Sequence, residues 1–144
     1  MIIEKPELII DAQAPLAEGP IWDVEQQVLW WTDILSSTVH RHDPANGENR
    51  TWEIGQMVGT IVTAKSSGLI LAAQNGFLRS APETGATKLI ADPEPAQPKN
   101  RFNDGKCDPA GRFWAGTMPQ SEDSATGALY CLHPDGQVKK KGGG

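Results

Sequence analysis

A strand-and-turn pattern that recurs three times constrains the fold of this 144-residue chain more than any other feature. Each copy holds a β-rich strand, a second strand and a turn rich in Pro, Gly, Asn or Asp, while helical periodicity is weak throughout. The first strands begin roughly 40 residues apart, which is the length of a four-stranded propeller blade. The first strands are Val28–Asp33, Gly68–Gln74 and Gly111–Thr117, and the second strands are Thr38–His42, Gly76–Ser80 and Ala128–Leu132.

The repeat predicts an all-β chain that forms an incomplete β-propeller of about three blades. Further strands are expected after the turns, at Arg50–Ile54 and Thr87–Ile90. A propeller removes most free sheet edges by closing a ring of blades, and three blades are too few to close one. The Pro-rich segment Ala91–Gln97 is interpreted as a loop between blades, because the repeat resumes directly after it.

The last copy lacks the apolar residues expected in its outer strand. After Val138 the chain reads Lys139–Gly144, three lysines followed by three glycines. We therefore predict one partial propeller over residues 1–138 and an atypical Lys/Gly tail over residues 139–144. An early end of the reading frame, an incomplete gene model and an added scar are alternative origins of this tail.

Composition and charge exclude several classes of partner. The formal net charge of -5 argues against nucleic acid, because such binding depends on Lys and Arg clusters that neutralise phosphates. Residues 1–10 contain charged side chains and no continuous apolar stretch, so neither a signal peptide nor a membrane span is expected. Cys107 and Cys131 match no metal-ligand spacing and are predicted to be reduced and mostly buried. We predict a cytoplasmic protein that binds neither nucleic acid nor membranes.

Two stretches outside the repeat are rich in polar residues. The first, Leu16–Trp22, places Glu18 directly before Gly-Pro, where a lone glutamate would ordinarily be a surface carboxylate. The second, Asn100–Met118, contains Asp104-Gly105, which a turn would explain without any function. A turn would not explain Arg101 and Asn103, which alternate and would lie on the same face of an extended strand. These residues are the candidates for chemistry.

Both stretches resemble the hallmark segments of the senescence-marker, regucalcin and gluconolactonase family. The family pattern opens with Gly-Glu-Gly-Pro-x-Trp, from which only Ala17 departs here, and continues with Arg-x-Asn-Asp-Gly-Lys-x-Asp-x-x-Gly-Arg-x-Trp-x-Gly-Thr-Met, which is kept nearly whole. The resemblance covers residues 8 to 138, the first half of a member with a six-bladed propeller. It implies a metal-dependent sugar-lactone hydrolase that converts an aldonolactone to the aldonic acid.

The resemblance also implies roles for individual residues. Glu18 matches the family's first ligand to a divalent cation, commonly calcium or zinc, with magnesium and manganese as alternatives. Arg101 and Asn103 match residues that bind polar groups of the sugar, and Glu122 lies near a further acidic substrate contact in a loop that differs here. Such a cation prefers oxygen ligands and polarises a lactone carbonyl.

The family's remaining metal ligands, an Asn and an Asp that is also the base for water attack, belong to later blades. No catalytic residue is therefore expected within these 144 residues, and the chain alone is predicted to be an inactive half.

Several alternatives remain beside the lactonase. One is a non-catalytic calcium-binding regulatory protein of the regucalcin type, another is self-association through open sheet edges, and a third is a hydrolase of phosphotriesters on the same scaffold. His40 and His42 could both face a metal, but a surface strand beside a hairpin is favoured. The five tryptophans could stack on sugars, although core packing is favoured. Asp33 could lie near the central channel, with turn capping as the favoured role.

Overall fold

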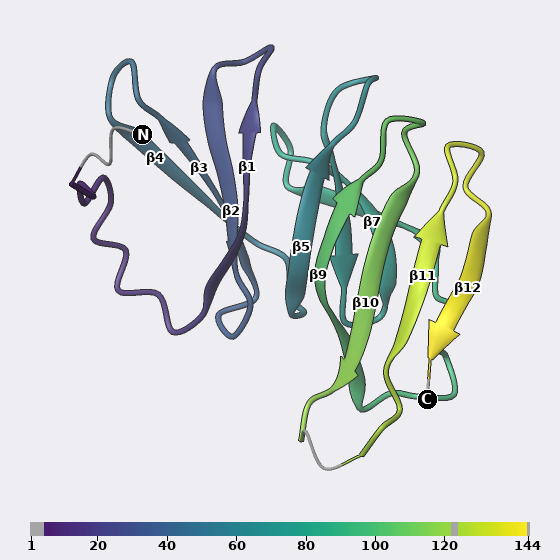
Figure 1. Ribbon diagram of the computed structural model, residues 1–144. Helices are drawn as coiled ribbons and strands as arrows, with labels where there is room; N and C mark the ends of the chain where they lie inside the picture. The colour runs from purple at the N-terminus through teal and green to yellow at the C-terminus, as the bar shows by residue number, and fades with distance from the viewer. Residues whose placement is uncertain (1–4, 122–123, 144) are drawn as a thin grey trace.

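The chain folds entirely into short antiparallel sheets. The computed structural model describes residues 5–121 and 124–143, and these contain twelve strands in three four-stranded sheets and no helix (Figure 1). Nowhere in the described residues is there a helix with the length and hydrophobicity needed to span a membrane. The all-β prediction and the three incomplete-ring blades are confirmed. The strands are β1 (Ala17–Asp23), β2 (Val28–Asp33), β3 (Thr38–Asp43), β4 (Glu48–Glu53), β5 (Val58–Thr63), β6 (Leu69–Ala73), β7 (Gly76–Ala81), β8 (Ala86–Ala91), β9 (Asn100–Cys107), β10 (Phe113–Pro119), β11 (Ala128–Leu132) and β12 (Val138–Gly143).

Each sheet is one blade whose strands follow each other in chain order. Blade 1 is β1 to β4, blade 2 is β5 to β8 and blade 3 is β9 to β12. The first strands β1, β5 and β9 contact one another at the centre of the fan, whereas β4 and β12 lie at its opposite ends (Figure 1). The sequence repeat predicted the second and third strands of every blade, but not these three inner strands.

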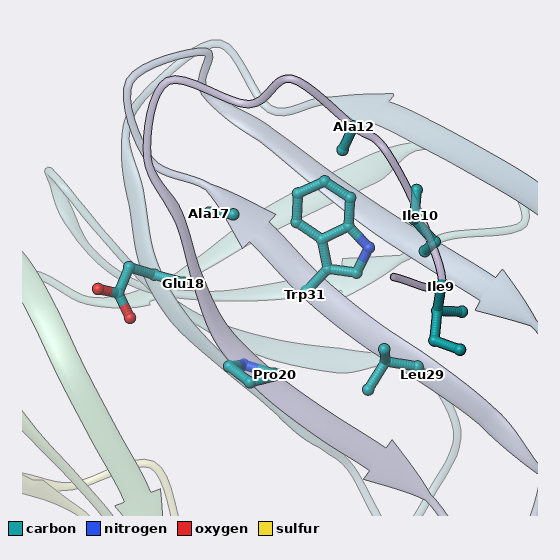
Figure 2. Close-up of a pocket in the computed structure, with 8 residues that line it drawn as sticks. All are labelled: Ile9, Ile10, Ala12, Ala17, Glu18, Pro20, Leu29 and Trp31. Carbon is teal, nitrogen blue, oxygen red and sulfur yellow. The ribbon is translucent and has the colours of Figure 1, made fainter. Parts of the chain in front are cut away.

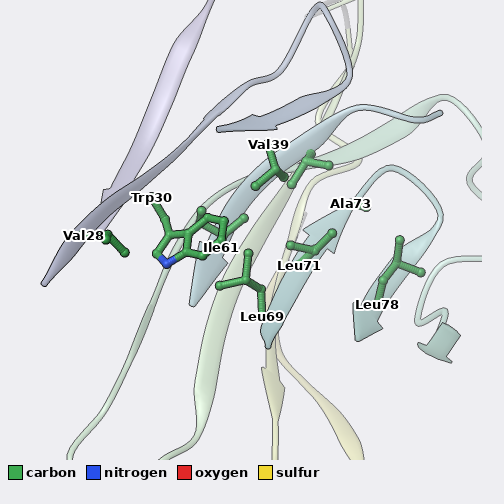
Figure 3. Packing of buried hydrophobic residues seen from close by; sticks show 9 residues of the cluster. Val28, Trp30, Val39, Ile61, Leu69, Leu71, Ala73 and Leu78 are labelled. Carbon is green, nitrogen blue, oxygen red and sulfur yellow. The ribbon is translucent and has the colours of Figure 1, made fainter. Parts of the chain in front are cut away.

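Blade 2 packs on both of its faces, and two hydrophobic cores result. Alternate residues along its strands point to opposite sides, so Ile61 and Leu71 meet blade 1 while Val62 and Ala72 meet blade 3. The first core includes Trp30, whose ring centroid lies 5.5 Å from that of Trp52 (Figure 3). The second core is built on aromatic rings: the centroid of Phe77 lies 4.6 Å from that of Phe102 and 5.5 Å from that of Phe113.

These aromatic and aliphatic contacts bear on two expectations from the sequence. Trp30 and Trp31 are buried, as core packing requires, whereas Trp22 is 43% exposed. Burying an aliphatic or aromatic side chain of this size contributes about 1.5–3 kcal/mol each. Of the two free cysteines, Cys131 is buried as predicted, but Cys107 is exposed because it ends β9 beyond the core.

The Lys/Gly segment after Val138 is part of a strand. Lys139 pairs with Cys131 and Lys140 with Tyr130, so β12 adds a fourth strand to blade 3 where the sequence predicted only a tail. The difference has a simple cause, because strand pairing uses backbone groups and does not require apolar side chains. Lysines are common on edge strands, where their charge discourages further pairing.

Candidate functional site

Each of the three inner strands carries a β-bulge at the same level of its blade. On β1 the pairing skips from Glu18 to Ile21 while β2 moves by only two residues, and on β5 the bulge falls at Gly59. On β9 it falls at Asn103 and Asp104, between the paired residues Phe102 and Gly105. A bulge bends a strand and changes the direction of the side chains beside it. The three bulges are therefore what aims side chains at the hub.

Two glycines bring the inner strands into close contact at these bulges. A methyl group added to Gly19, which has φ of +58°, would lie 3.2 Å from Thr60 Oγ1 on β5. A methyl group added to Gly59 would collide with the carbonyl oxygens of Phe102 and Asn103 on β9. Glu18 and Asn103 are thus each within one residue of a contact with β5. Residues far apart in the sequence are brought to one hub by backbone packing.

Thr60 connects the same three strands and was not identified from the sequence. Its side chain is fully buried, and Oγ1 donates a hydrogen bond of 3.3 Å to the Gly105 carbonyl on β9. Thr32 on β2 makes the matching link, donating to the Val58 carbonyl at 2.7 Å. The segment VGTIV reads as an apolar strand, and only the glycine beside Thr60 in it indicated a close approach.

Glu18 is exposed, and its strand is fixed two residues earlier. The Leu16 N–H donates to Asp33 Oδ1 at 3.1 Å, and the Ile34 N–H donates to the Leu16 carbonyl at 3.0 Å. Asp33 is only 3% exposed, and it holds the start of β1 rather than lining the hub. Figure 2 shows the Glu18 carboxylate pointing away from Trp31. This side chain is free to meet a ligand in solvent.

Arg101 and Asn103 form a hydrogen-bonded pair on β9. Arg101 is 8% exposed, and its Nη1 donates to Asn103 Oδ1 at 3.0 Å and to the Phe102 carbonyl at 3.1 Å. The two side chains meet on one side of the strand, and Asn103 is exposed. Because Asn103 Oδ1 already accepts from a guanidinium, the amide nitrogen Nδ2 is the group placed to donate to a ligand oxygen. That polarity suits a sugar hydroxyl or carbonyl better than a cation.

The Asp104-Gly105 pair belongs to strand β9, so the alternative that it forms a turn is wrong. Gly105 pairs with Ala115, and a methyl group there would clash with the Trp114 carbonyl. Tertiary packing overrides the turn preference of this dipeptide, because only glycine lets β10 come so close. Asp104 is exposed and lies 3.6 Å from Lys106.

A cavity of about 270 Å³ adjoins Glu18 on the side of blade 1 that faces away from blade 2 (Figure 2). Its lining is apolar except for Glu18, and neither Arg101 nor Asn103 contributes to it. The cavity therefore does not coincide with the hub. It is lined by Ile9, Ile10, Ala12, Ala17, Glu18, Pro20, Leu29 and Trp31.

Comparison with known families identifies this arrangement. The model of the SMP-30/Gluconolactonase/LRE-like region matches residues 16–144. The chain belongs to this family. It is 37% identical over 127 residues to the 6-deoxy-6-sulfogluconolactonase of Pseudomonas putida, and 34% identical over 141 residues to the regucalcin of Xenopus laevis. These alignments cover 88% and 94% of this chain.

A solved structure from the family shares the fold. The calcium-binding protein regucalcin of Agrobacterium tumefaciens superposes with a TM-score of 0.86 at 29% identity and covers 92% of this chain. The chain spans less than half of these relatives: 43% and 47% of the two sequences and 44% of the solved structure. The structural neighbours in the family are six-bladed propellers, of which the three blades here correspond to a part.

The part of the family site that this chain supplies fits one metal ligand, not a complete set. Among the described residues, no group of three or more His, Cys, Asp or Glu side chains could hold an ion. Glu18 is an exposed carboxylate at the hub, the donor type that calcium prefers. Glu122 lies outside the described residues.

The two histidines of β3 are occupied by other contacts. The His40 ring stacks on Trp31 with centroids 3.8 Å apart, and its nitrogens meet Thr38 Oγ1 at 2.8 Å and Thr51 Oγ1 at 3.0 Å. Burial lowers the pKa of His40, while the nearby Asp33 opposes this shift. The His42 Nδ1 lies 2.8 Å from Asn49 Oδ1. These contacts give both rings a structural role in blade 1.

A half-buried glutamate that the sequence did not identify anchors the start of β9. Glu94 Oε1 accepts hydrogen bonds from Tyr130 OH and Thr117 Oγ1, both at 2.9 Å, and Oε2 accepts from Asn100 Nδ2 at 2.9 Å. Asn100 also exchanges hydrogen bonds with Thr126, across the base of the loop between β10 and β11. Burial, with the bond to Glu94 second, raises the pKa of Tyr130 to about 12. This network fixes the residue directly before Arg101.

Proposed function

We propose that this protein is a sugar-lactone hydrolase in which Glu18 binds a divalent cation and Arg101 and Asn103 bind oxygens of the sugar. The observation that carries the proposal is the set of three bulged inner strands, which brings Glu18 and the Arg101–Asn103 pair to one hub. Relatives named as lactonases support the reaction class. Calcium and zinc are the favoured cations, and magnesium and manganese are the alternatives. Glu122 is a weaker candidate for a substrate contact.

The chain's own residues perform binding and orientation in this proposal. The Arg101 guanidinium holds Asn103 by its oxygen, so the Asn103 amide nitrogen is presented toward a sugar oxygen. The exposed Glu18 carboxylate supplies one oxygen donor to the cation. A bound cation of this kind polarises the lactone carbonyl and lowers the pKa of a bound water. Because no base accompanies these groups, we propose that the 144-residue chain alone does not turn over glucono-1,5-lactone.

The proposal is tested with a chimaera that joins residues 1–138 to the unmatched part of the Pseudomonas putida relative. The measurement is hydrolysis of glucono-1,5-lactone with calcium, zinc or manganese, corrected for the spontaneous rate. Replacing Glu18 with Gln removes a metal ligand, and we expect kcat/KM to fall at least about 100-fold, the scale of losing a group that stabilises the transition state. The control is Glu25→Gln, an exposed carboxylate in the turn after β1.

Circular dichroism of both variants shows whether the chimaera is folded. A folded, active chimaera in which Glu18→Gln hydrolyses the lactone as fast as Glu25→Gln would contradict the metal assignment. Clear turnover by residues 1–144 alone would contradict the predicted inactivity.

The second candidate is a calcium-binding regulatory protein without selected turnover, favoured by the regucalcin relatives and by the solved regucalcin named as a calcium-binding protein. The same chimaera separates the two functions. Calcium binding that depends on Glu18, in a folded chimaera without lactone hydrolysis, would favour this role. The cytoplasmic location stays a prediction from the sequence.

A further inference from the structure

Blades 1 and 3 each leave one sheet face uncovered by the described residues. In blade 1 this face, called here the open face of blade 1, carries Trp22, Leu29, Trp31 and His40, which alternate with residues packed on blade 2. In blade 3 the open face carries Lys106, Trp114, Leu129 and Lys139, which alternate with the core residues Phe113 and Tyr130. Trp22 is 43% and Leu129 41% exposed, so both faces present large apolar side chains to solvent.

The two open faces are of complementary kinds. Blade 1 packs with the face that carries Trp30 against blade 2, and blade 2 packs with its opposite face against blade 3. Each contact thus joins the later face of one blade to the earlier face of the next. The open face of blade 3 is a later face and the open face of blade 1 is an earlier face. Contact between them would repeat the packing already present twice in the chain.

The curvature of the three blades matches half of a closed ring. The chain superposes on 44% of the Agrobacterium tumefaciens regucalcin with a TM-score of 0.86. Because the family's propellers have six blades, two copies of the three-bladed arc contain the number needed for closure. A twofold axis through the hub would form both contacts at once, which closes the assembly instead of extending it.

The charges on the two faces also differ in sign. The open face of blade 3 gathers Lys106, Lys139 and Lys141, and Arg112 lies with Lys141 over the Trp114 ring at 5.5 and 6.0 Å. Asp104 and Asp108 offset this charge only in part. The open face of blade 1 carries Asp33 and Glu53, which share the Thr38 row, whereas Arg41 and Arg50 pair on the opposite face. Opposite charge favours correct pairing of two surfaces.

We propose that two copies of this 144-residue chain assemble into one six-bladed ring, in which each copy covers the other's open blade faces. The apolar cavity beside Trp31 is then the seat for blade 3 of the second copy. The ring would place two Glu18 carboxylates and two Arg101–Asn103 pairs around the same hub. This proposal stands independently of lactone hydrolysis, since it rests on sheet packing alone.

The test is the molar mass of purified residues 1–144, measured by native mass spectrometry and by light scattering after size exclusion. We expect a species of twice the 15.5 kDa chain mass. A folded 15.5 kDa monomer at micromolar concentration would overturn the proposal, and would indicate that the faces await further blades of a longer chain. An open series of larger assemblies would equally overturn the closed ring.

Two variants locate the contact. Trp22→Glu on blade 1 and Leu129→Glu on blade 3 each place a charge in both interfaces of the dimer, and we expect the dissociation constant to rise at least about tenfold. The matched control is Leu89→Glu, a leucine of similar exposure (54%) on β8 of the middle blade, which should leave the mass unchanged. A dimer equally stable in all three variants would contradict the assignment of the faces.

Mixing the two variants distinguishes loss of an interface from loss of folding. A ring of one Trp22→Glu chain and one Leu129→Glu chain has one interface with both changes and one interface with neither. We expect the mixture to form more dimer than either variant alone. Failure to do so, with normal circular dichroism for both chains, would count against a twofold ring.

Discussion

The close approach of β5 to β9 at Gly59 should make this residue intolerant of even one added methyl group. In Gly59→Ala the new Cβ would lie 2.5 Å from the Phe102 carbonyl carbon, whereas ordinary contact begins at 3.4 Å, so β9 must move by about 0.9 Å. Overpacking of this kind costs about 1–3 kcal/mol, and the stiffer unfolded chain returns about 0.5 kcal/mol. We expect a net loss of about 1.5 kcal/mol, or a fall in Tm of about 3–6 °C for a domain of this size.

The assay is thermal and urea unfolding followed by far-ultraviolet circular dichroism. Gly116→Ala on β10 is the control, because nothing lies within 4 Å of its added methyl group. That variant should unfold at the wild-type temperature or slightly above it. If Gly59→Ala unfolds together with Gly116→Ala, the inner strands are not in tight contact, and the geometric basis for joining Glu18 to Asn103 fails.

Two further predictions concern ionisation in blade 3. Tyr130 is the single tyrosine of the chain, so absorbance at 295 nm should show a phenol that titrates near pH 12. Because folding raises this pKa, stability should be complete below pH 10 and should fall as pH rises toward 12; a midpoint near 10 in the folded protein would contradict the Glu94 contact. Asp108 has a pKa lowered to about 2, first by the hydrogen bond from Trp114 Nε1 and then by bonds from Arg112. Stability should therefore decrease between pH 4 and 2 in the wild type but less in Asp108→Asn, as measured by urea unfolding, and equal acid sensitivity of both proteins would refute this role.

The sequence predicted the repeat because most strands outside the hub follow rules of local pattern. The segments around Trp30 and Leu71 alternate between faces or run as short apolar stretches, and Pro and Gly mark the turns between them. The fourth strand of blade 3 was missed because β12 is held by backbone pairing, with lysines facing solvent. Its residues carry no hydrophobic period to detect.

The inner strands were missed for a different reason. Glu18-Gly19-Pro20 and Asn103-Asp104-Gly105 have the composition of turns, and only contact with neighbouring strands keeps them extended. Arg101 and Asn103 were recognised as a pair because alternation along a strand is a local property. Thr60 and Glu94 were not, since their importance comes from partners on other strands or loops. Local sequence patterns therefore located the polar residues better than the framework that joins them.

The repeated bulge has a consequence for how such a hub can change. The same irregular backbone step occurs in all three blades, yet it is filled by Gly-Pro in one, a lone glycine in the next and Asn-Asp in the third. The interlocking of blades is governed by residues on either side of this step, so the identity of what occupies it is only loosely tied to stability. Each blade thus offers an interchangeable position, where a new ligand-binding group could be tried without redesigning the scaffold around it.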